Sequence, residues 1–427
     1  MWVFYFFAAL LILQAVISLR GGVRYLSYFR RELAAPASDF TPFASIIVPC
    51  RGLDEGLQDN LDALFRQGYP AYEIIFVVDS PDDPALEVIE KVRWVGENVW
   101  YPTTRVVGAG KATESGQKVH NLRAAVEAID ERSEVFVFVD TDARPRRDWL
   151  RSLIAPLAAE EIGATTGYRW FVPGGGGGFA SHLRAVWNAS IASALGENSR
   201  RNFCWGGSTA IRRATFEQLD MSMQWRGTVS DDFTLTRVLQ QARLPIHFVP
   251  RCLTASHEAC RWRELSEFTT RQLKITRVYA PHLWRIVLAS NFLFVAIFYG
   301  GLALSWSRFW RGTPYALPLA LVVAIFVFGS AKALLRLRAV ALAFEARREI
   351  WRARIICAHL CLWPLTSALF LYNALAAACS RRITWRGISY ELKSPTETVI
   401  INPRLREDAA TAAAVERTDE TTPVRRA

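Results

Sequence analysis

Two kinds of apolar pattern divide this chain. Four long runs contain no Asp, Glu, Lys or Arg: Trp2–Leu19, Ile286–Ser307, Gly312–Ala331 and Ile355–Ser380. Each is close to the roughly 20 residues that a membrane-spanning helix needs. Between the first and second runs, the apolar segments are short and alternate with more polar ones. We therefore expect a folded domain held by membrane helices at both ends.

The short segments predict alternating strands and helices. Ala44–Val48, Glu73–Val78 and Glu134–Val139 are short, mostly apolar segments rich in Val, Ile and Phe, as in buried strands. Leu57–Arg66 and Lys118–Ile129 have helical spacing. Strands that alternate with helices favour right-handed crossovers and a parallel sheet. The predicted fold class is α/β, with a mainly parallel sheet flanked by helices.

The patterns also predict a division of the chain. We expect an N-terminal transmembrane helix at 1–20, a linker at 21–44, a cytoplasmic α/β domain at 45–282 with an interfacial helix near 264–280, and membrane segments at 283–380. Residues 381–427 are expected to form a cytoplasmic segment that continues, from Ser394 onward, as a polar, disordered tail. The first run lacks a charged start and a small-residue cleavage site, so it predicts an anchor.

Four spans would place the basic segments 332–354 and 381–393 on opposite sides of the membrane. A re-entrant last run, broken at Trp363-Pro364, would remove that conflict.

Charge and cysteine content refine the class of protein. The net charge is +11, and basic residues crowd beside the apolar runs. This pattern favours cytoplasmic flanks of membrane helices and anionic lipid over nucleic acid. Seven cysteines without paired spacing indicate a reducing compartment for the soluble part. We expect a multi-pass protein of the cell membrane.

Acidic residues follow the predicted strands. Asp140 and Asp142 come directly after a buried strand, where open α/β sheets bind ligands. Two such carboxylates can share Mg²⁺ or Mn²⁺, which takes its remaining ligands from water and phosphates. A solvated strand end is the alternative. Asp79 ends an earlier strand, and Lys118 precedes the Asp140 strand, where it could neutralise a phosphate.

A further acidic pair, Asp231-Asp232, precedes the helical pattern Phe233–Leu239. Carboxylates at a helix N-terminus can cap the helix. The same position would suit a well-held general base.

Five stretches, in this order, resemble the ceramide glucosyltransferases. They are the segment from Gly52 to Ala85, Lys118-Val119-His120-Asn121-Leu122, Asp140-Thr141-Asp142-Ala143-Arg144, Ser230-Asp231-Asp232-Phe233 and Trp385-Arg386-Gly387-Ile388-Ser389-Tyr390. The resemblance covers roughly residues 45–392. The broader relatives are the processive and lipid-directed family 2 glycosyltransferases, which have a GT-A fold.

The resemblance implies roles for individual residues. Asp79 would contact the uridine of a nucleotide sugar, and Lys118 would help to bind that nucleotide. Asp140 and Asp142 would hold Mg²⁺ or Mn²⁺ on the diphosphate. Asp232, ahead of Asp231, would deprotonate the acceptor hydroxyl and give inversion.

One stretch departs from the family. Where the family has (Gln/Arg)-x-x-Arg-Trp, this chain has Arg271-x-x-Lys274-Ile275. Lys274 keeps a cation without the planar fork of Arg, and Arg277 could supply a cation from the next turn. We expect all three cations to serve donor binding, and an amphipathic helix meeting lipid phosphates is compatible with this.

The expected function is transfer of a sugar, from a donor such as a UDP-hexose, to a hydroxyl of ceramide or another membrane lipid. Alternatives are a processive polysaccharide synthase, a haloacid-dehalogenase-like phosphohydrolase phosphorylated on Asp140, and a non-catalytic membrane scaffold. The expected partners are a nucleotide sugar, a lipid acceptor and the bilayer.

Overall fold

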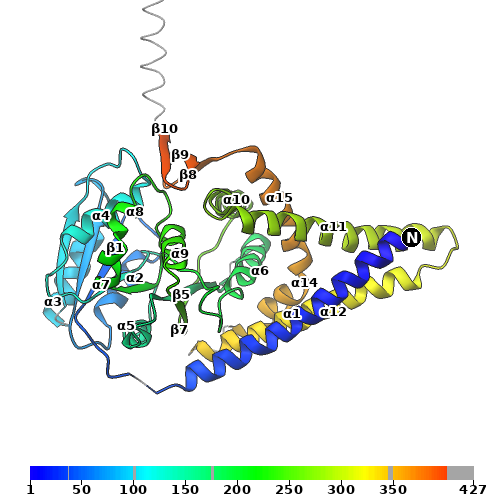
Figure 1. The fold of residues 1–427 in the computed structure, drawn as a ribbon, viewed down its shortest axis with the longest axis horizontal. Coiled ribbons are helices and arrows are strands. Elements are labelled where there is room, and N and C mark those ends of the chain that lie inside the picture. Colours follow the sequence, from blue (N-terminus) through cyan, green and yellow to red (C-terminus); the bar gives the residue numbers. More distant parts are fainter. Residues whose placement is uncertain (37, 100–101, 175–176, 345–349, 402–427) are drawn as a thin grey trace, which may run out of the picture.

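The computed structural model describes residues 1–36, 38–99, 102–174, 177–344 and 350–401. An α/β domain carries a long arm built from α1 (Trp2–Ala34), α11 (Pro281–Trp310) and α12 (Ala316–Ala343) (Figure 1). The expected fold class, a mainly parallel sheet flanked by helices with apolar helices at both ends, is confirmed.

The central sheet has seven strands in the order β3-β2-β1-β4-β6-β5-β7. Their bounds are β1 Ala44–Pro49, β2 Tyr72–Val78, β3 Thr103–Gly108, β4 Val135–Phe138, β5 Ala164–Phe171, β6 Thr209–Arg212 and β7 Ile246–Ser256. The first four are parallel neighbours. Strand β6 runs antiparallel to both β4 and β5, and β5 is parallel to β7.

Helices cover the sheet and connect its strands. They are α2 Leu57–Phe65, α3 Ala85–Val99, α4 Gln117–Glu127, α5 Trp149–Ile154, the short 3₁₀ helix η1 Ala155–Ala158, α6 Phe179–Ala192, α7 Arg213–Gln218, α8 Met221–Gln224, α9 Asp231–Gln241 and α10 Trp262–Tyr279. Two apolar layers bury opposite faces of β1, which places Ile46 in one and Ile47 in the other.

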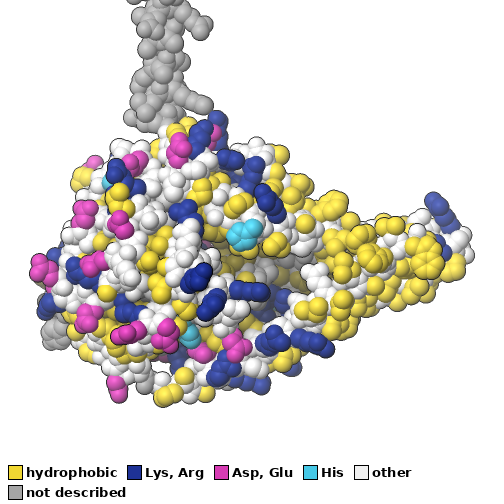
Figure 2. Space-filling model, viewed as in Figure 1, with side chains coloured by type: hydrophobic (Ala, Val, Ile, Leu, Met, Phe, Trp, Pro, Cys, Tyr) yellow, Lys and Arg dark blue, Asp and Glu magenta, His cyan; other side chains and the backbone are white. Residues whose placement is uncertain are grey.

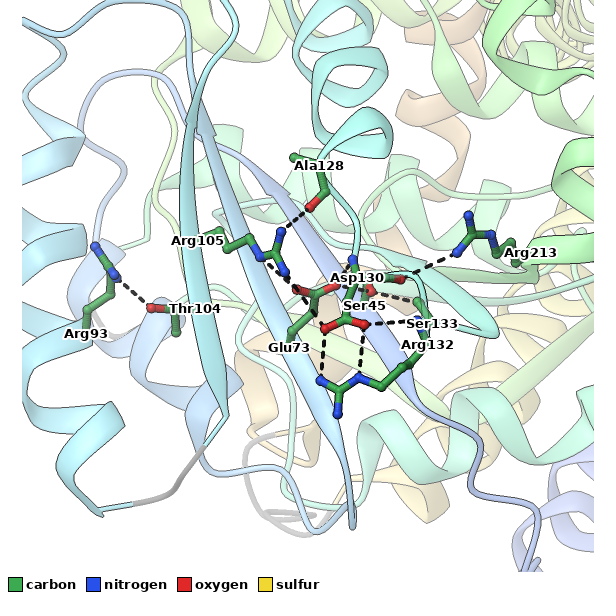
Figure 3. A network of polar contacts seen from close by, with 10 residues as sticks. All are labelled: Ser45, Glu73, Arg93, Thr104, Arg105, Ala128, Asp130, Arg132, Ser133 and Arg213. Atoms are coloured by element: carbon green, nitrogen blue, oxygen red, sulfur yellow. Dashed lines mark hydrogen bonds and ion pairs between the residues drawn. The ribbon is translucent and has the colours of Figure 1, made fainter.

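A polar network fixes the N-terminal ends of the parallel strands (Figure 3). Glu73, at the start of β2, is only 1% exposed. Its carboxylate accepts hydrogen bonds from Ser45 Oγ at 2.6 Å and from the Asp130 N–H at 2.8 Å. Arg105 Nε lies 3.5 Å from the second carboxylate oxygen. Neighbouring strands are thereby held in register, and their carboxyl ends meet at the opposite edge.

Helix α1 is longer than the sequence predicts. The linker expected at 21–44 is wrong for residues 21–34, which continue the helix. The reason is tertiary packing. Phe29 is fully buried against Phe248 of β7, and the Tyr28 hydroxyl donates a hydrogen bond to the Phe248 carbonyl. Helix α1 therefore runs from the arm onto the α/β domain.

Three helices, α1, α11 and α12, are long and apolar enough to cross a membrane. The fourth apolar run forms α14 (Ala353–Cys361) and α15 (Trp363–Cys379), which are bent by 58° at the expected break. The N-terminus and the α11–α12 turn lie toward the far end of the arm in Figure 1. Segments 332–344 and 381–393 both pack against the α/β domain, which fits a last run that does not cross.

The segment after α15 is folded up to residue 401. Strands β8 (Arg382–Trp385), β9 (Ile388–Ser394) and β10 (Glu397–Ile401) form a small antiparallel sheet. The expectation of a polar, disordered tail from Ser394 onward is therefore wrong for 394–401. The cause is packing against the α/β domain: Tyr390 and Leu392 are buried beside Val229 and Ile275. Residues 402–427 of the expected tail lie outside the described residues.

Candidate active site

The carboxyl ends of β2, β1 and β4 bring the acidic motifs to one edge of the sheet. Asp79 follows β2, and Asp140 and Asp142 follow β4. The loop after β4 is held by Asn60 of α2, whose amide donates a hydrogen bond to the Thr141 carbonyl at 3.0 Å. The site is therefore built on parallel strands, as the sequence predicts.

Two partly buried cations contact the carboxylates that follow β4. Lys118 Nζ lies 2.7 Å from Asp140 Oδ1, and Arg169 Nη1 lies 2.8 Å from Asp142 Oδ2. Arg169 comes from β5, and its guanidinium lies 5.3 Å from the centre of the Trp205 ring. Burial tends to raise the pKa of Asp140, but Lys118 outweighs burial and lowers it.

The Asp140–Asp142 pair has the chemistry of a divalent-cation site. Asp142 Oδ1 is buried and has no hydrogen-bond partner, so this oxygen could serve as a ligand of a cation. No group of three or more His, Cys, Asp or Glu suited to a metal occurs among the residues that the structure describes. Mg²⁺ and Mn²⁺ fit such a site, because a hard cation can complete its shell with water and phosphate oxygens.

Lys118 joins the metal motif to the predicted base motif. Its ammonium also lies 3.1 Å from Asp231 Oδ1. Burial, opposed by the attraction of Lys118, raises the pKa of Asp231 to about 6. A Cβ at Gly206 would lie 2.4 Å from Asp231 Oδ2 and 2.6 Å from Lys118 Nζ, so a larger residue there would displace this ion pair.

Asp232 lies beside this group but is not part of the Lys118 cluster. It is half-buried at the start of α9, where its Oδ1 accepts a hydrogen bond from the Phe233 N–H at 2.7 Å. Ser230 caps the helix and donates its hydroxyl to the same carboxylate oxygen. These two hydrogen bonds fix the position of the Asp232 carboxylate at the start of the helix. Both aspartates line the same cavity, but Asp231 is the one that is ion-paired.

The small C-terminal sheet contacts the loop that follows β1. Arg386, in the turn between β8 and β9, lies 2.7 Å from Asp54 Oδ1 and donates a hydrogen bond to the Arg51 carbonyl at 3.0 Å. Arg51 in turn forms an ion pair with Asp79. Asp79 is buried beside the cavity, whereas Arg51 and Arg386 line it.

The three cations predicted on α10 separate in the structure. Arg271 lines the cavity and is stacked 5.6 Å from the centre of the Trp385 ring. Burial and the nearby Arg169 and Arg386 lower the pKa of Arg271 to about 10.

The other two predicted α10 cations lie outside the site. Lys274 donates to the Arg382 carbonyl at 2.7 Å, and Arg277 donates to the Ala377 carbonyl. Neither lines the cavity. Donor binding by Lys274 and Arg277 is therefore not supported, because their helix face is turned toward the C-terminal segment.

A cavity of about 1930 Å³ connects the β4 carboxylates, the α9 aspartates and the cations that contact them. One part is lined by Asp140, Asp142, Asp232 and the cations described above. The other part continues between the helices of the arm, where Ile286, Phe294 and Ile325 form apolar walls. The charged site thus opens directly into an apolar chamber.

Sequence reasoning missed three site residues. Arg51 lies two residues after β1, Arg169 lies in the aromatic stretch 168–171 of β5, and Arg386 belongs to the C-terminal Trp-Arg motif. The position of each arginine near a strand or within a motif could have marked it as a candidate. The sequence does not indicate their ion pairs, because the acidic partners lie far away along the chain.

Comparisons with known proteins identify the family of this chain. The family described as glycosyl transferase family 21 matches residues 4–398. Ceramide glucosyltransferase 1 of Caenorhabditis elegans is 25% identical over 137 residues, which are 32% of this chain and 28% of that protein. Ceramide glucosyltransferase 3 of the same organism is 41% identical over 49 residues, 12% of this chain and 11% of that protein. The matched stretches thus span less than a third of these relatives.

Two solved structures are distantly similar. The mannosyltransferase PcManGT of Pyrobaculum calidifontis, in complex with GDP-Man and Mn²⁺, is 18% identical with a TM-score of 0.43, covering 87% of this chain and 98% of that one. Glucosyl-3-phosphoglycerate synthase of Mycobacterium tuberculosis, with Mn²⁺ and UDP-glucose, is 15% identical with a TM-score of 0.35, covering 58% and 80%. Because the family model spans most of its length, this chain belongs to glycosyl transferase family 21.

Proposed function

We propose that this protein is a membrane-bound inverting glycosyltransferase. It transfers a hexose from a nucleotide-diphosphate donor, such as a UDP-hexose, to a hydroxyl of a membrane lipid, which is either ceramide-like or of another class. The α/β domain, residues 45–282, faces the cytoplasm, and α1, α11 and α12 cross the cell membrane. Family membership supports glycosyl transfer, and the three apolar helices support membrane attachment.

The observation that carries the proposal is the continuity of the cavity. Asp140, Asp142 and Asp232 line the same space as the apolar residues Phe294 and Ile325 of the arm. A water-soluble donor can therefore reach the carboxylates from the α/β domain. An acceptor can keep its acyl chains in the apolar chamber while its hydroxyl lies at Asp232. A water-soluble acceptor would not need the apolar walls of this chamber.

On the acceptor side, Asp232 is the proposed general base. Its carboxylate takes the proton of the acceptor hydroxyl, and the hydroxyl oxygen forms a bond to the anomeric carbon of the sugar. The bond from that carbon to the diphosphate breaks on the opposite face, so the configuration inverts. A positioned base of this kind contributes about 10² to 10⁴ in rate.

On the donor side, cations surround the position proposed for the diphosphate. Asp140 and Asp142 would hold Mg²⁺ or Mn²⁺, which would offset charge on the leaving diphosphate. Arg271 and Arg386 line the same part of the cavity and can bind phosphate oxygens. Lys118 holds Asp140 and Asp231 in place, and the Arg51–Asp79 pair lies where the uridine would be bound.

Donor turnover tests the proposal. Detergent-purified protein is incubated with Mn²⁺, mixed membrane lipids and a series of UDP-sugars, and UDP release is followed. We expect release with at least one donor, and its loss in Asp232→Asn. Mass spectrometry of the lipids then identifies the glycosylated acceptor. Nucleotide binding without turnover of any donor and lipid would contradict the proposal and favour a non-catalytic scaffold.

A further inference from the structure

Two cations of α12 line the part of the cavity that lies within the arm. Lys332 and Arg336 are one helical turn apart, so they share a face of the helix. Arg336 is only 6% exposed, although it carries a permanent charge. The stem of Lys332 packs against α1, where its Cγ lies 3.5 Å from the position of a Cβ on Gly22. These two side chains take no part in the mechanism proposed above.

Neither cation is neutralised by an acid within the described residues. Arg336 Nη1 donates a single long hydrogen bond, 3.4 Å, to Ser193 Oγ, and its Nε has no partner. The nearby end of α6 offers only the partial negative charge of a helix C-terminus. The hydroxyl of Tyr25, which packs in the same apolar cluster as α12, is also buried without a partner.

Such an arrangement is unfavourable by itself. Like charges at positions i and i+4 of a helix repel, and burial of an unpaired charge is strongly unfavourable. An anion bound between Lys332 and Arg336 would offset their mutual repulsion and would pair the buried charge. Ionisable residues in the membrane part of a protein commonly mark a binding site for this reason.

The walls around these cations indicate what kind of anion fits. The chamber combines apolar residues of α11 and α12, such as Ile286 and Ile325, with Gln14 and Ser18 of α1. Figure 2 shows Lys and Arg side chains beside the hollow between the α/β domain and the arm, and hydrophobic side chains covering the arm itself. A ligand that satisfies both surfaces has acyl chains and an acidic headgroup.

We propose that Lys332 and Arg336 bind the phosphate of an acidic phospholipid inside this cavity. The inference rests on the proposed function and narrows it, because it names acidic phospholipids as the lipid class that the chamber admits. The acyl chains lie along Ile286, Phe294 and Ile325, and the headgroup lies between the two cations and the charged site.

Lipid binding by the full-length, detergent-purified protein tests this proposal without any need for turnover. Native mass spectrometry compares phosphatidylglycerol with diacylglycerol of the same acyl chains. We expect phosphatidylglycerol to bind at least about tenfold more tightly, as charge-assisted hydrogen bonds predict. Lys332→Gln and Arg336→Gln should each lose about tenfold of this preference, whereas Lys332→Arg and Arg336→Lys should retain most of it.

Arg338→Gln is the matched control, because Arg338 lies on the same helix but is exposed. It should bind both lipids as the wild type does. Equal binding of the two lipids by the wild type, or an equal loss in Arg338→Gln, would overturn the proposal. If glycerol 3-phosphate, which has no acyl chains, binds tightly, Lys332 and Arg336 form a site for a soluble phosphate compound and not for a lipid. If Arg336→Gln does not fold, Lys332→Gln decides, since Lys332 is less deeply buried than Arg336.

Donor turnover is measured on the same samples as the release of UDP from UDP-sugar. Loss of the lipid preference with intact donor turnover would refute only the lipid class. A persistent preference in a protein that turns over no donor would refute only the proposed transferase activity.

Discussion

The ammonium of Lys118 lies 2.7 Å from Asp140 Oδ1, so a lysine neutralises one of the two carboxylates assigned to the metal. The same ammonium contacts Asp231 at the start of α9. Lys118 therefore couples the donor half of the site to the acceptor half. Asp140 and Asp231 together raise its pKa well above its usual value, although burial opposes this. The lysine is consequently charged at any physiological pH.

Lys118→Gln should destabilise the metal-free protein. The substitution leaves Asp140 and Asp231 without their shared cation, and loss of one partner from a buried ion pair costs about 3 to 5 kcal/mol. Thermal unfolding in detergent measures the effect, and Mn²⁺ should restore part of the lost stability by supplying positive charge at Asp140. Lys111→Gln, at an exposed loop position, is the control. Equal melting temperatures for the two variants would contradict the bridging role.

Replacement of each of the two aspartates at the start of α9 by asparagine should have different effects. Asp232→Asn should lower turnover by about 10² to 10⁴ with little change in donor affinity, because only the base is removed. Asp231→Asn should mainly lower stability, since it removes a partner of Lys118. Single-turnover rates and donor titrations separate the effects. A larger loss of the chemical step in Asp231→Asn would transfer the role of base to Asp231.

Gly206→Ala should disrupt the Lys118 cluster. The added methyl would lie 2.4 Å from Asp231 Oδ2, well inside contact distance. Forcing an extra carbon into a packed site costs about 1 to 3 kcal/mol. The matched control is Gly196→Ala, where nothing lies within 4 Å of the new carbon. Thermal unfolding of both variants checks the prediction, which fails if they melt together.

Arg386→Gln should weaken donor binding by about tenfold, because a charge-assisted hydrogen bond to phosphate is lost. The substitution also releases the C-terminal sheet from Asp54. Calorimetric titration with UDP-sugar and Mn²⁺ measures the affinity. Arg382→Gln, at an exposed position in the same small sheet, should bind the donor nearly as well as the wild type. If both variants lost affinity equally, the effect would come from the sheet and not from the guanidinium.

Local patterns were sufficient to predict the elements that position the acids. Buried strands such as Glu73–Val78 and helices such as Lys118–Ile129 are signalled by neighbouring residues, and their alternation implies a parallel sheet. The sheet then places Asp79, Asp140 and Asp142 at one edge. The acidic half of the site could therefore be found without any structure.

Contacts between distant segments could not be predicted in this way. Arg386 reaches Asp54 across 332 positions of the chain, and Phe29 extends α1 by packing against Phe248. The direction of a helix face is equally a tertiary property. Lys274 and Arg277 have suitable spacing, but packing turns them toward the carbonyls of Arg382 and Ala377.

Membrane topology provides the last prediction. If α1, α11 and α12 cross the membrane and the bent pair α14–α15 does not, Thr313 and Lys393 lie on opposite sides. Thr313 is exposed in the turn between α11 and α12, and Lys393 is exposed on β9. Each is replaced by Cys in a protein whose exposed Cys357, Cys361 and Cys379 are changed to Ser. A membrane-impermeant maleimide on intact cells should label Thr313→Cys. Lys393→Cys should be labelled only in permeabilised cells.

Labelling of both positions in intact cells would mean that α14–α15 crosses as a fourth span, which would separate the small C-terminal sheet from a cytoplasmic α/β domain. Because Arg386 of that sheet contacts Asp54 of the domain, the structure predicts that they share one side.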